Sequence, residues 1–194
     1  TLYLKDGKAV KSAEDMTPIG DIYELCELYN DSGIDKIIIF DLSKDDIEHE
    51  KNIYIIRNIN RNIEIKVCAG GNIDRIEDVK KLLYAGCLQV ILNGSKANCI
   101  ELAEEASQRF TRDRILLSVS NVDFIFKHRN RIEELFHELL LLDSKLLDSV
   151  ENITDVPHVV TYKRFDFEKL AGVLKREYVR GITGPFISEP GIDI

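Results

Sequence analysis

Short apolar runs alternate with longer segments of helical periodicity along most of this chain. Residues 36–40 (KIIIF) and 89–92 (QVIL) are apolar without the polar alternation of a half-exposed strand. Such runs are typical of strands that are buried on both faces of a parallel sheet. Between the runs, apolar residues recur at helical spacing, as in the segment 74–86. The pattern therefore predicts βα units in series.

The repeat can be followed through the chain. Gly33 and Gly86 each end a predicted helix just before a strand. Two alternatives remain for the segment 132–150: one long helix, or the end of a helix followed by a strand and a short helix. We expect eight βα steps, which favours a compact, partly degenerate (βα)8 TIM-type barrel with parallel strands over an open doubly wound sheet. The expected strands are 2–4, 35–41, 65–68, 89–92, 114–120, 139–142, 158–162 and one within 178–187. The expected helices are 21–33, 47–58, 74–86, 97–110, 122–137, 146–150 and 167–175.

Length and composition narrow the class of protein. The 194 residues suit a single domain spanning 1–194, and the end of the chain soon after a strand suggests a fragment of a longer protein. A net charge of −8 argues against nucleic-acid or anionic-membrane binding, and no apolar run approaches the roughly 20 residues of a membrane span. The four cysteines lack the spacing of zinc or disulfide sites and are expected to be reduced core thiols. Without a visible export signal, the expected location is the cytoplasm.

Two polar turns follow neighbouring predicted strands. Gly70, Gly71 and Asn72 come after the third strand, and the segment 93–95 (Asn93, Gly94 and Ser95) comes after the fourth. Because the carboxyl ends of parallel strands share one edge of a sheet, both turns are expected there. Helix starts with exposed N–H groups suit a phosphate. The alternatives are a tight turn at the first position and a helix cap at the second.

Other polar residues are weaker candidates. Lys11 and Asp41 are candidate ligand contacts at the mouth of the barrel, or else a solvated lysine and a strand-ending cap. The chain offers no metal-ligand spacing, so no metal site and no cofactor are expected. The four histidines, expected on the surface or in the core, are His49, His128, His137 and His158.

Several motifs together resemble the histidine-biosynthesis barrel family, which includes a phosphoribosylformimino-aminoimidazole-carboxamide ribotide isomerase and the cyclase subunit of imidazole glycerol phosphate synthase. LYLKDGKAVK is similar to the family's first strand and loop, IIIFDLS to its second strand, CAGGNI to its third turn, and VILNGS to its fourth. VVTYKRF and GITGPFIS are similar, more loosely, to strands seven and eight. The resemblance implies the TIM-type barrel fold and a phosphorylated, ribose-type ligand.

The departures from the family are as informative as the matches. The family's chemistry uses one aspartate on strand one and another at the end of strand five, and Tyr3 and Ser120 stand at those positions. Neither side chain is an acid near neutral pH. The second phosphate turn is replaced by 162–164 (YKR), although Gly184 still matches near the end of strand eight.

The resemblance implies a role as well. The chain is similar to the degenerate amino-terminal domain of bifunctional phosphoribosyl-AMP cyclohydrolase and phosphoribosyl-ATP pyrophosphatase proteins. We therefore expect a non-catalytic domain that binds a phosphorylated ligand or assembles with fused or associated histidine-biosynthesis domains. The alternative is an active isomerase that uses the shifted carboxylates Asp6 or Asp123.

Overall fold

A computed structural model of the chain describes residues 1–164 and 166–185. Its contacts divide the chain into two compact units, each described here by itself. The first unit contains Thr1–Val90 together with Pro185, and the second contains Ile91–Gly184. The chain passes from one to the other within strand β6 (Gln89–Asn93).

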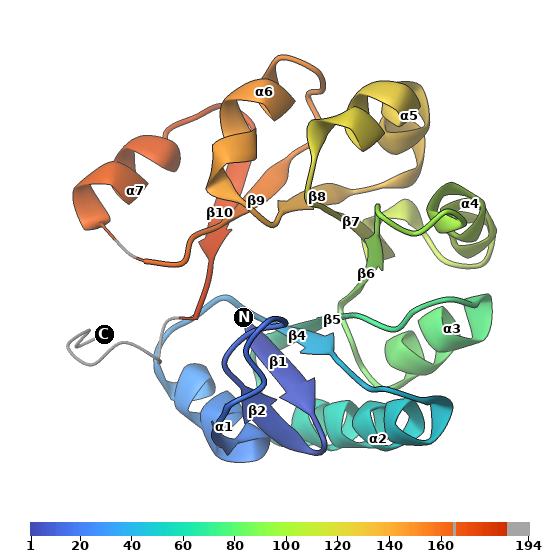
Figure 1. Cartoon of the computed structure of the whole chain (residues 1–194), viewed down its shortest axis with the longest axis vertical. Helices are drawn as coiled ribbons and strands as arrows, with labels where there is room; N and C mark the ends of the chain where they lie inside the picture. The colour runs from blue at the N-terminus through green and yellow to red at the C-terminus, as the bar shows by residue number, and fades with distance from the viewer. Residues whose placement is uncertain (165, 186–194) are drawn as a thin grey trace. The chain divides into compact units, whose positions relative to one another are not determined.

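The first unit is a sheet with helices on one side (Figure 1). Its strands run in the order β5-β4-β1-β2-β3, and β1 pairs with β4, and β4 with β5, in parallel. Leu4 lies beside Asp41 in this register, so the carboxyl ends of β1 and β4 meet at one edge. The elements are β1 (Leu2–Lys5), β2 (Lys8–Val10), β3 (Pro18–Asp21), α1 (Ile22–Asp31), β4 (Lys36–Asp41), α2 (Asp46–Asn62), β5 (Lys66–Gly70) and α3 (Ile76–Tyr84).

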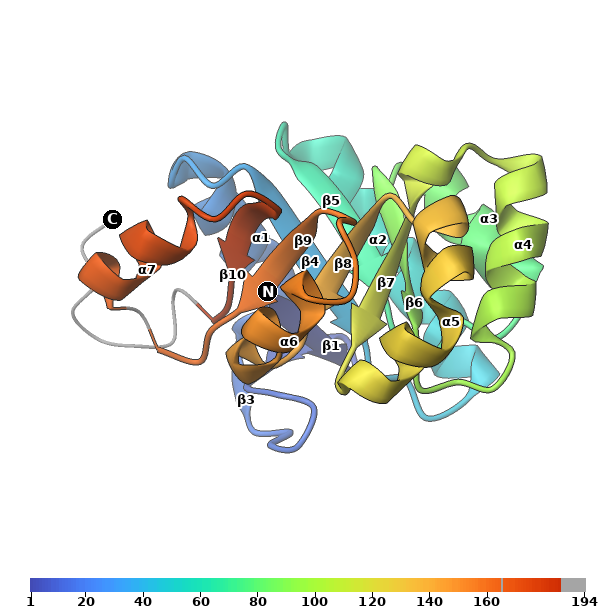
Figure 2. The ribbon, with the colours of Figure 1, turned by 90° about the horizontal axis from the view of Figure 1, so that it is seen from above.

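The second unit repeats the βα order. Strands β7 and β8, β8 and β9, and β9 and β10 pair in parallel. Helix α5 lies between α4 and α6 (Figure 2). The elements are α4 (Cys99–Arg109), a 3₁₀ turn (Arg112–Arg114), β7 (Ile115–Val119), α5 (Val122–Leu135), β8 (Glu138–Leu141), a 3₁₀ turn (Ser144–Leu146), α6 (Leu147–Glu151), β9 (His158–Thr161), α7 (Phe167–Val173) and β10 (Val179–Thr183).

The predicted α/β class with parallel strands is confirmed, and the serial βα order is consistent with a TIM-type barrel. Side-chain caps explain several helix starts. Asp21 accepts from the N–H groups of Tyr23 and Glu24 at α1, and Asp45 accepts from Glu48 at α2. The four cysteines are buried and free, as predicted.

Of the two alternatives for 132–150, the structure has the helix, strand and short helix, because Glu138, Leu139, Leu140 and Leu141 are buried and pair as β8 with β7 and β9. Two other local features differ from the prediction. Pro18 predicts a loop, but the segment forms strand β3, since β2 offers it an antiparallel edge. The apolar spacing of the helix at 21–33 predicts that Leu28 is buried. It is 48% exposed, because the buried face of α1 consists of Ile22, Cys26 and Tyr29.

Candidate functional site

A buried polar cluster lies at the carboxyl end of β4 in the first unit. Asp41 is its centre, and one carboxylate oxygen accepts from the Asn52 side chain (2.6 Å) and from the Ser43 N–H (2.8 Å). The other oxygen lies 3.1 Å from the Ser43 hydroxyl and 2.5 Å from His49 Nδ1. We use the name buried polar cluster for five residues: Asp41, Ser43, His49, Asn52 and Asp78.

His49 lies between two carboxylates. Its Nε2 atom is 3.7 Å from Asp78 Oδ1, which is too long for a hydrogen bond and short enough for an ion pair. The hydrogen bond to Asp41 raises the pKa of His49; burial acts in the opposite direction, and the charges of Asp41 and Asp78 raise it further. The site therefore favours the imidazolium form more than bulk water does.

Asp78 also caps the helix on which it lies. Its Oδ2 atom accepts from the backbone N–H groups of Asp74 (3.2 Å) and Arg75 (3.0 Å), just before α3 begins. These helix-start amides were expected to be open to a phosphate. Instead, the chain's own carboxylate occupies them.

The predicted glycine turn follows β5 directly. Gly70 is the last residue of that strand and pairs with Phe40. Gly71 has φ +83°, and a Cβ atom there would lie 2.1 Å from the Asp41 carbonyl oxygen. Only glycine fits this approach of two backbones. The turn is therefore packed against the end of β4.

Asn72 connects this turn to the buried polar cluster. It has φ +46°, a conformation that asparagine tolerates better than most residues. Its side-chain amide donates to the carbonyl and the hydroxyl oxygen of Ser43. Among the described residues, no acceptor bonds the N–H of Gly71 or Asn72. Two donors thus remain for a ligand at this turn.

A second anchor holds the β1–β2 turn. Glu48 accepts from Lys5 Nζ (3.2 Å), from the Asp6 N–H (2.8 Å) and from the Lys44 N–H (2.9 Å). Burial acts to raise the pKa of Glu48, but these hydrogen bonds outweigh it and lower the pKa. The exposed Asp6 is therefore held by its backbone, with φ +48°.

Tyr3, which is predicted to stand at the position of the family's first aspartate, lies in β1. Its ring stacks on Phe40, with centroids 5.8 Å apart and an angle of 19° between the planes. Burial raises the pKa of Tyr3, with a smaller contribution from Glu14. The hydroxyl is therefore protonated at neutral pH and is no base.

The other predicted turn lies in the second unit. The N–H of Gly94 donates to the carbonyl of Ser118 (2.9 Å), and that of Ser95 donates to the Asn93 side chain (2.9 Å). The Ser95 hydroxyl lies 3.4 Å from that of Ser120. Because α4 begins only at Cys99, this turn is not the helix cap that the sequence suggested.

The remaining candidates lie apart from these groups. The exposed ammonium of Lys11 pairs with Asp15 at 3.1 Å, beside the beginning of β1, whereas Asp41 lies beside its end. In the second unit, Gly184 follows β10 and the exposed Asp123 lies in the first turn of α5.

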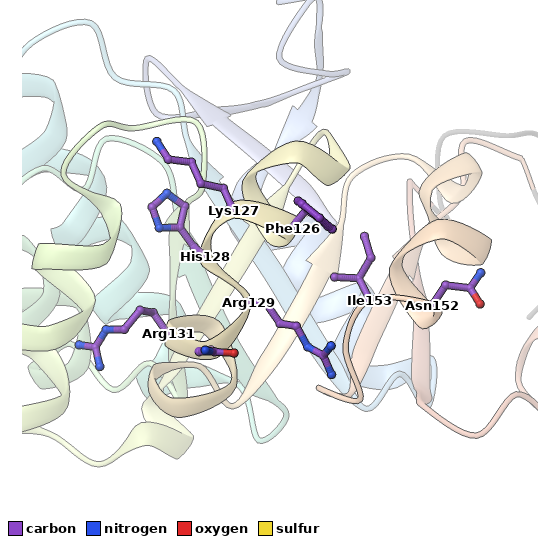
Figure 3. A pocket seen from close by; sticks show the side chains of 8 residues that line it. Phe126, Lys127, His128, Arg129, Arg131, Asn152 and Ile153 are labelled. Carbon is purple, nitrogen blue, oxygen red and sulfur yellow. The ribbon is translucent and has the colours of Figure 1, made fainter.

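A groove of about 550 Å³ lies between α5 and the end of α6 in the second unit (Figure 3). His128 has non-helical angles there (φ −115°, ψ 19°), which kink α5. Figure 3 shows the ring of Phe126 near Ile153, with Lys127 and His128 pointing away from them. Arg129 pairs with Glu133. The groove therefore brings together few polar groups that point to one ligand.

No group of histidine, cysteine, aspartate and glutamate side chains in the described part of the chain could hold a metal ion. None of the described helices is long and apolar enough to cross a bilayer.

Most of the buried polar cluster was not predicted. His49, expected on the surface or in the core, is buried, and its bond to Asp41 was not anticipated. One signal was available. His49 and Asn52 lie three residues apart on the helix that follows Asp41, so both face the same side.

Parallel βα units with a polar cluster and a glycine turn at the carboxyl ends of β4 and β5 are consistent with a TIM-type α/β protein. The model of the family described as histidine biosynthesis protein matches residues 1–144, and the chain belongs to this family.

Relatives with curated names support the same family. The chain is 29% identical over 185 residues to the imidazole glycerol phosphate synthase subunit HisF of Staphylococcus epidermidis (strain ATCC 12228 / FDA PCI 1200), covering 89% of this chain and 73% of that protein. It is 31% identical over 120 residues to the same subunit of Trichormus variabilis, covering 61% and 47% of the two chains. The Campylobacter concisus subunit is 28% identical, with 61% and 48% covered. The chain thus spans about half the length of several relatives.

Proposed function

We propose that this chain is a non-catalytic barrel domain of histidine biosynthesis that binds a phosphorylated, ribose-type small molecule. The observation that carries the proposal is Tyr3, a stacked and protonated phenol at the position where the family has a catalytic aspartate. A general base must accept a proton near the working pH, and this group does not.

The other polar groups fit a binding role better than a catalytic one. Asp41 is a buried carboxylate at the carboxyl edge of the first unit, and its oxygens already bond Ser43, His49 and Asn52. A carboxylate engaged in this way positions its neighbours. The N–H groups of Gly71 and Asn72 are the donors we assign to the phosphate.

A protein partner fits the same family. The relatives are named as subunits of a synthase, so they work in an assembly. We propose that this domain is fused to, or associates with, other histidine-biosynthesis domains in the cytoplasm, with phosphoribosyl-AMP cyclohydrolase and phosphoribosyl-ATP pyrophosphatase as the expected fused activities. Sequencing the reading frame after Ile194 tests the fusion directly, and a stop codon there would contradict it.

The absence of catalysis gives the first prediction. Incubated with the family's aminoimidazole-carboxamide ribotide substrate, the chain should show no turnover above a buffer control, because Tyr3 and Ser120 supply no acid–base pair. Product formation is followed by absorbance and chromatography. Turnover that is lost in Asp6→Asn or Asp123→Asn would instead establish the alternative, an isomerase with shifted carboxylates.

Anion binding gives the second prediction. Titration with inorganic phosphate or ribose 5-phosphate should shift the amide resonances of Gly71 and Asn72 first, with those of the turn at 93–95 as the second proposed contact. Asn72→Asp should weaken binding roughly tenfold, or by about 1.4 kcal/mol. The new carboxylate repels the anion and cannot donate to Ser43 as the amide does.

Asn30→Asp is the matched control. It makes the same change at the other end of β5, where the side-chain oxygen accepts from the N–H groups of Glu64 and Ile65 and is retained by aspartate. Equal weakening in both variants would indicate a general charge effect, and unchanged binding in Asn72→Asp would place the site elsewhere.

A further inference from the structure

A continuous series of polar contacts joins the buried histidine to the glycine turn. Asn72 donates to Ser43, Ser43 donates to Asp41, and Asp41 bonds His49. On its other side, His49 faces Asp78 across 3.7 Å. The series begins at Asn72 in the loop between β5 and α3 and ends at Asp78 in the first turn of α3.

Asp78 closes the series. Its other oxygen holds the N–H groups of Asp74 and Arg75, which follow the glycine turn in sequence. His49 thus lies between the two loops that form this edge, one from β4 to α2 and the other from β5 to α3. A protonated His49 attracts both Asp41 and Asp78, whereas a neutral His49 leaves the two carboxylates to repel each other.

We propose that His49 is a proton-operated latch, which holds the glycine turn in its binding conformation when protonated and releases it when neutral. Protonated, the ring donates to Asp41 and attracts Asp78. When it is neutral, two buried carboxylates face each other without a cation between them, and that arrangement is costly. The latch regulates the anion site, and this consequence rests on the proposed function.

The charges around His49 support this direction. Asp41 faces it from β4 and Asp78 from α3, while Glu50 on its own helix adds negative charge. The nearby cations include Lys81, which pairs with Glu50, and Arg75, whose guanidinium lies 3.4 Å from Asp78 Oδ1 and 3.6 Å from Asp46. Arg75 is largely exposed, with 57% of its side chain accessible, so it screens Asp78 weakly.

A pH titration by NMR tests the latch without any ligand, and it is our third prediction. The ring resonances of His49 should titrate with a midpoint above the unperturbed value of about 6.5. The amides of residues 71–75 should shift and exchange faster with the same midpoint. In Asp78→Asn the midpoint of His49 should fall, because one of its two carboxylates is lost.

Glu77→Gln is the matched control. It removes one charge from the same turn of α3, at a side chain that is 56% exposed and pairs with Lys80. The midpoint of His49 should stay where it is in the wild-type chain. If Asp78→Asn does not fold, the wild-type chain alone tests the latch: the His49 ring and the amides of residues 71–75 should titrate with the same midpoint. A His49 midpoint at or below 6.5, or amides of 71–75 that do not follow it, overturns the latch.

A separate arm tests the link to the ligand. Sulfate serves as the probe, because its charge does not change over this range of pH. Its affinity should fall about fivefold as the pH rises through the His49 midpoint, which is the low end of usual coupling between sites. Absence of sulfate and phosphate binding at every pH would refute the proposed function, while coincident ring and amide midpoints would still support the latch.

Discussion

Replacing Gly71 with alanine should destabilise the first unit by about 4 kcal/mol or more, a loss that few single substitutions reach. The new Cβ atom would lie 2.1 Å from the carbonyl oxygen of Asp41 and 2.9 Å from its nitrogen. Both are backbone atoms of a central strand, so neither can turn away as a side chain would. Urea unfolding followed by circular dichroism measures the change in the free energy of unfolding.

Gly33→Ala is the control for this variant. Gly33 has a similar φ of +73°, but a Cβ atom added there would have no neighbour within 4 Å. It should cost only the strain of a left-handed backbone, about 1–2 kcal/mol. Equal losses in the two variants would show that the approach to Asp41 adds nothing to the requirement for glycine.

Removing the centre of the buried polar cluster should cost nearly as much. We expect Asp41→Ala to lower the free energy of unfolding by about 3–5 kcal/mol, because it leaves His49 and Asn52 buried without their acceptor. Asp41→Asn should cost less, since an amide oxygen remains. Thermal and urea unfolding at several pH values measure both.

The pH dependence follows from the raised pKa of His49. When the pKa of a histidine is higher in the folded than in the unfolded state, its protonation stabilises the fold. This contribution is fully present below about pH 6.5, and it is lost as the pH rises through the folded pKa. The cost of Asp41→Ala should therefore shrink on going to alkaline pH. Asp15→Asn, which breaks the exposed pair with Lys11, is the control. Hydrogen bonds to Thr17 and Lys11 lower the pKa of Asp15 to about 2, so this variant should leave the change in stability between neutral and alkaline pH as it is in the wild-type chain. A cost of Asp41→Ala that is the same at every pH would show that His49 carries no such linkage.

Much of the fold could be predicted because the strands are buried on both faces. The run from Ile37 to Ile39 has no polar alternation, and glycines at 33 and 86 mark where helices end. Strand β3 escaped prediction because all four of its residues are exposed and it begins with Pro18. Its partner β2 alone makes it a strand.

The site was less predictable, for a physical reason. The sequence showed that the turns at 70–72 and 93–95 follow strands, but not which N–H groups the chain itself would satisfy. The amide of Gly94 bonds the carbonyl of Ser118, and those before α3 bond Asp78. Whether such a bond forms depends on how closely two segments approach in the folded chain. The spacing of apolar residues along the sequence carries no information about that approach.

The reaction of the buried cysteines with a thiol reagent can report how often each unit opens. Burial raises the pKa of Cys26 and of Cys99 to about 12, so the reactive thiolate is scarce while the chain is folded. A thiol reagent therefore reacts mainly with molecules that have opened locally. Cys26, Cys68 and Cys87 lie in the first unit and Cys99 in the second, so the order in which they are labelled ranks the two units by how readily each one opens.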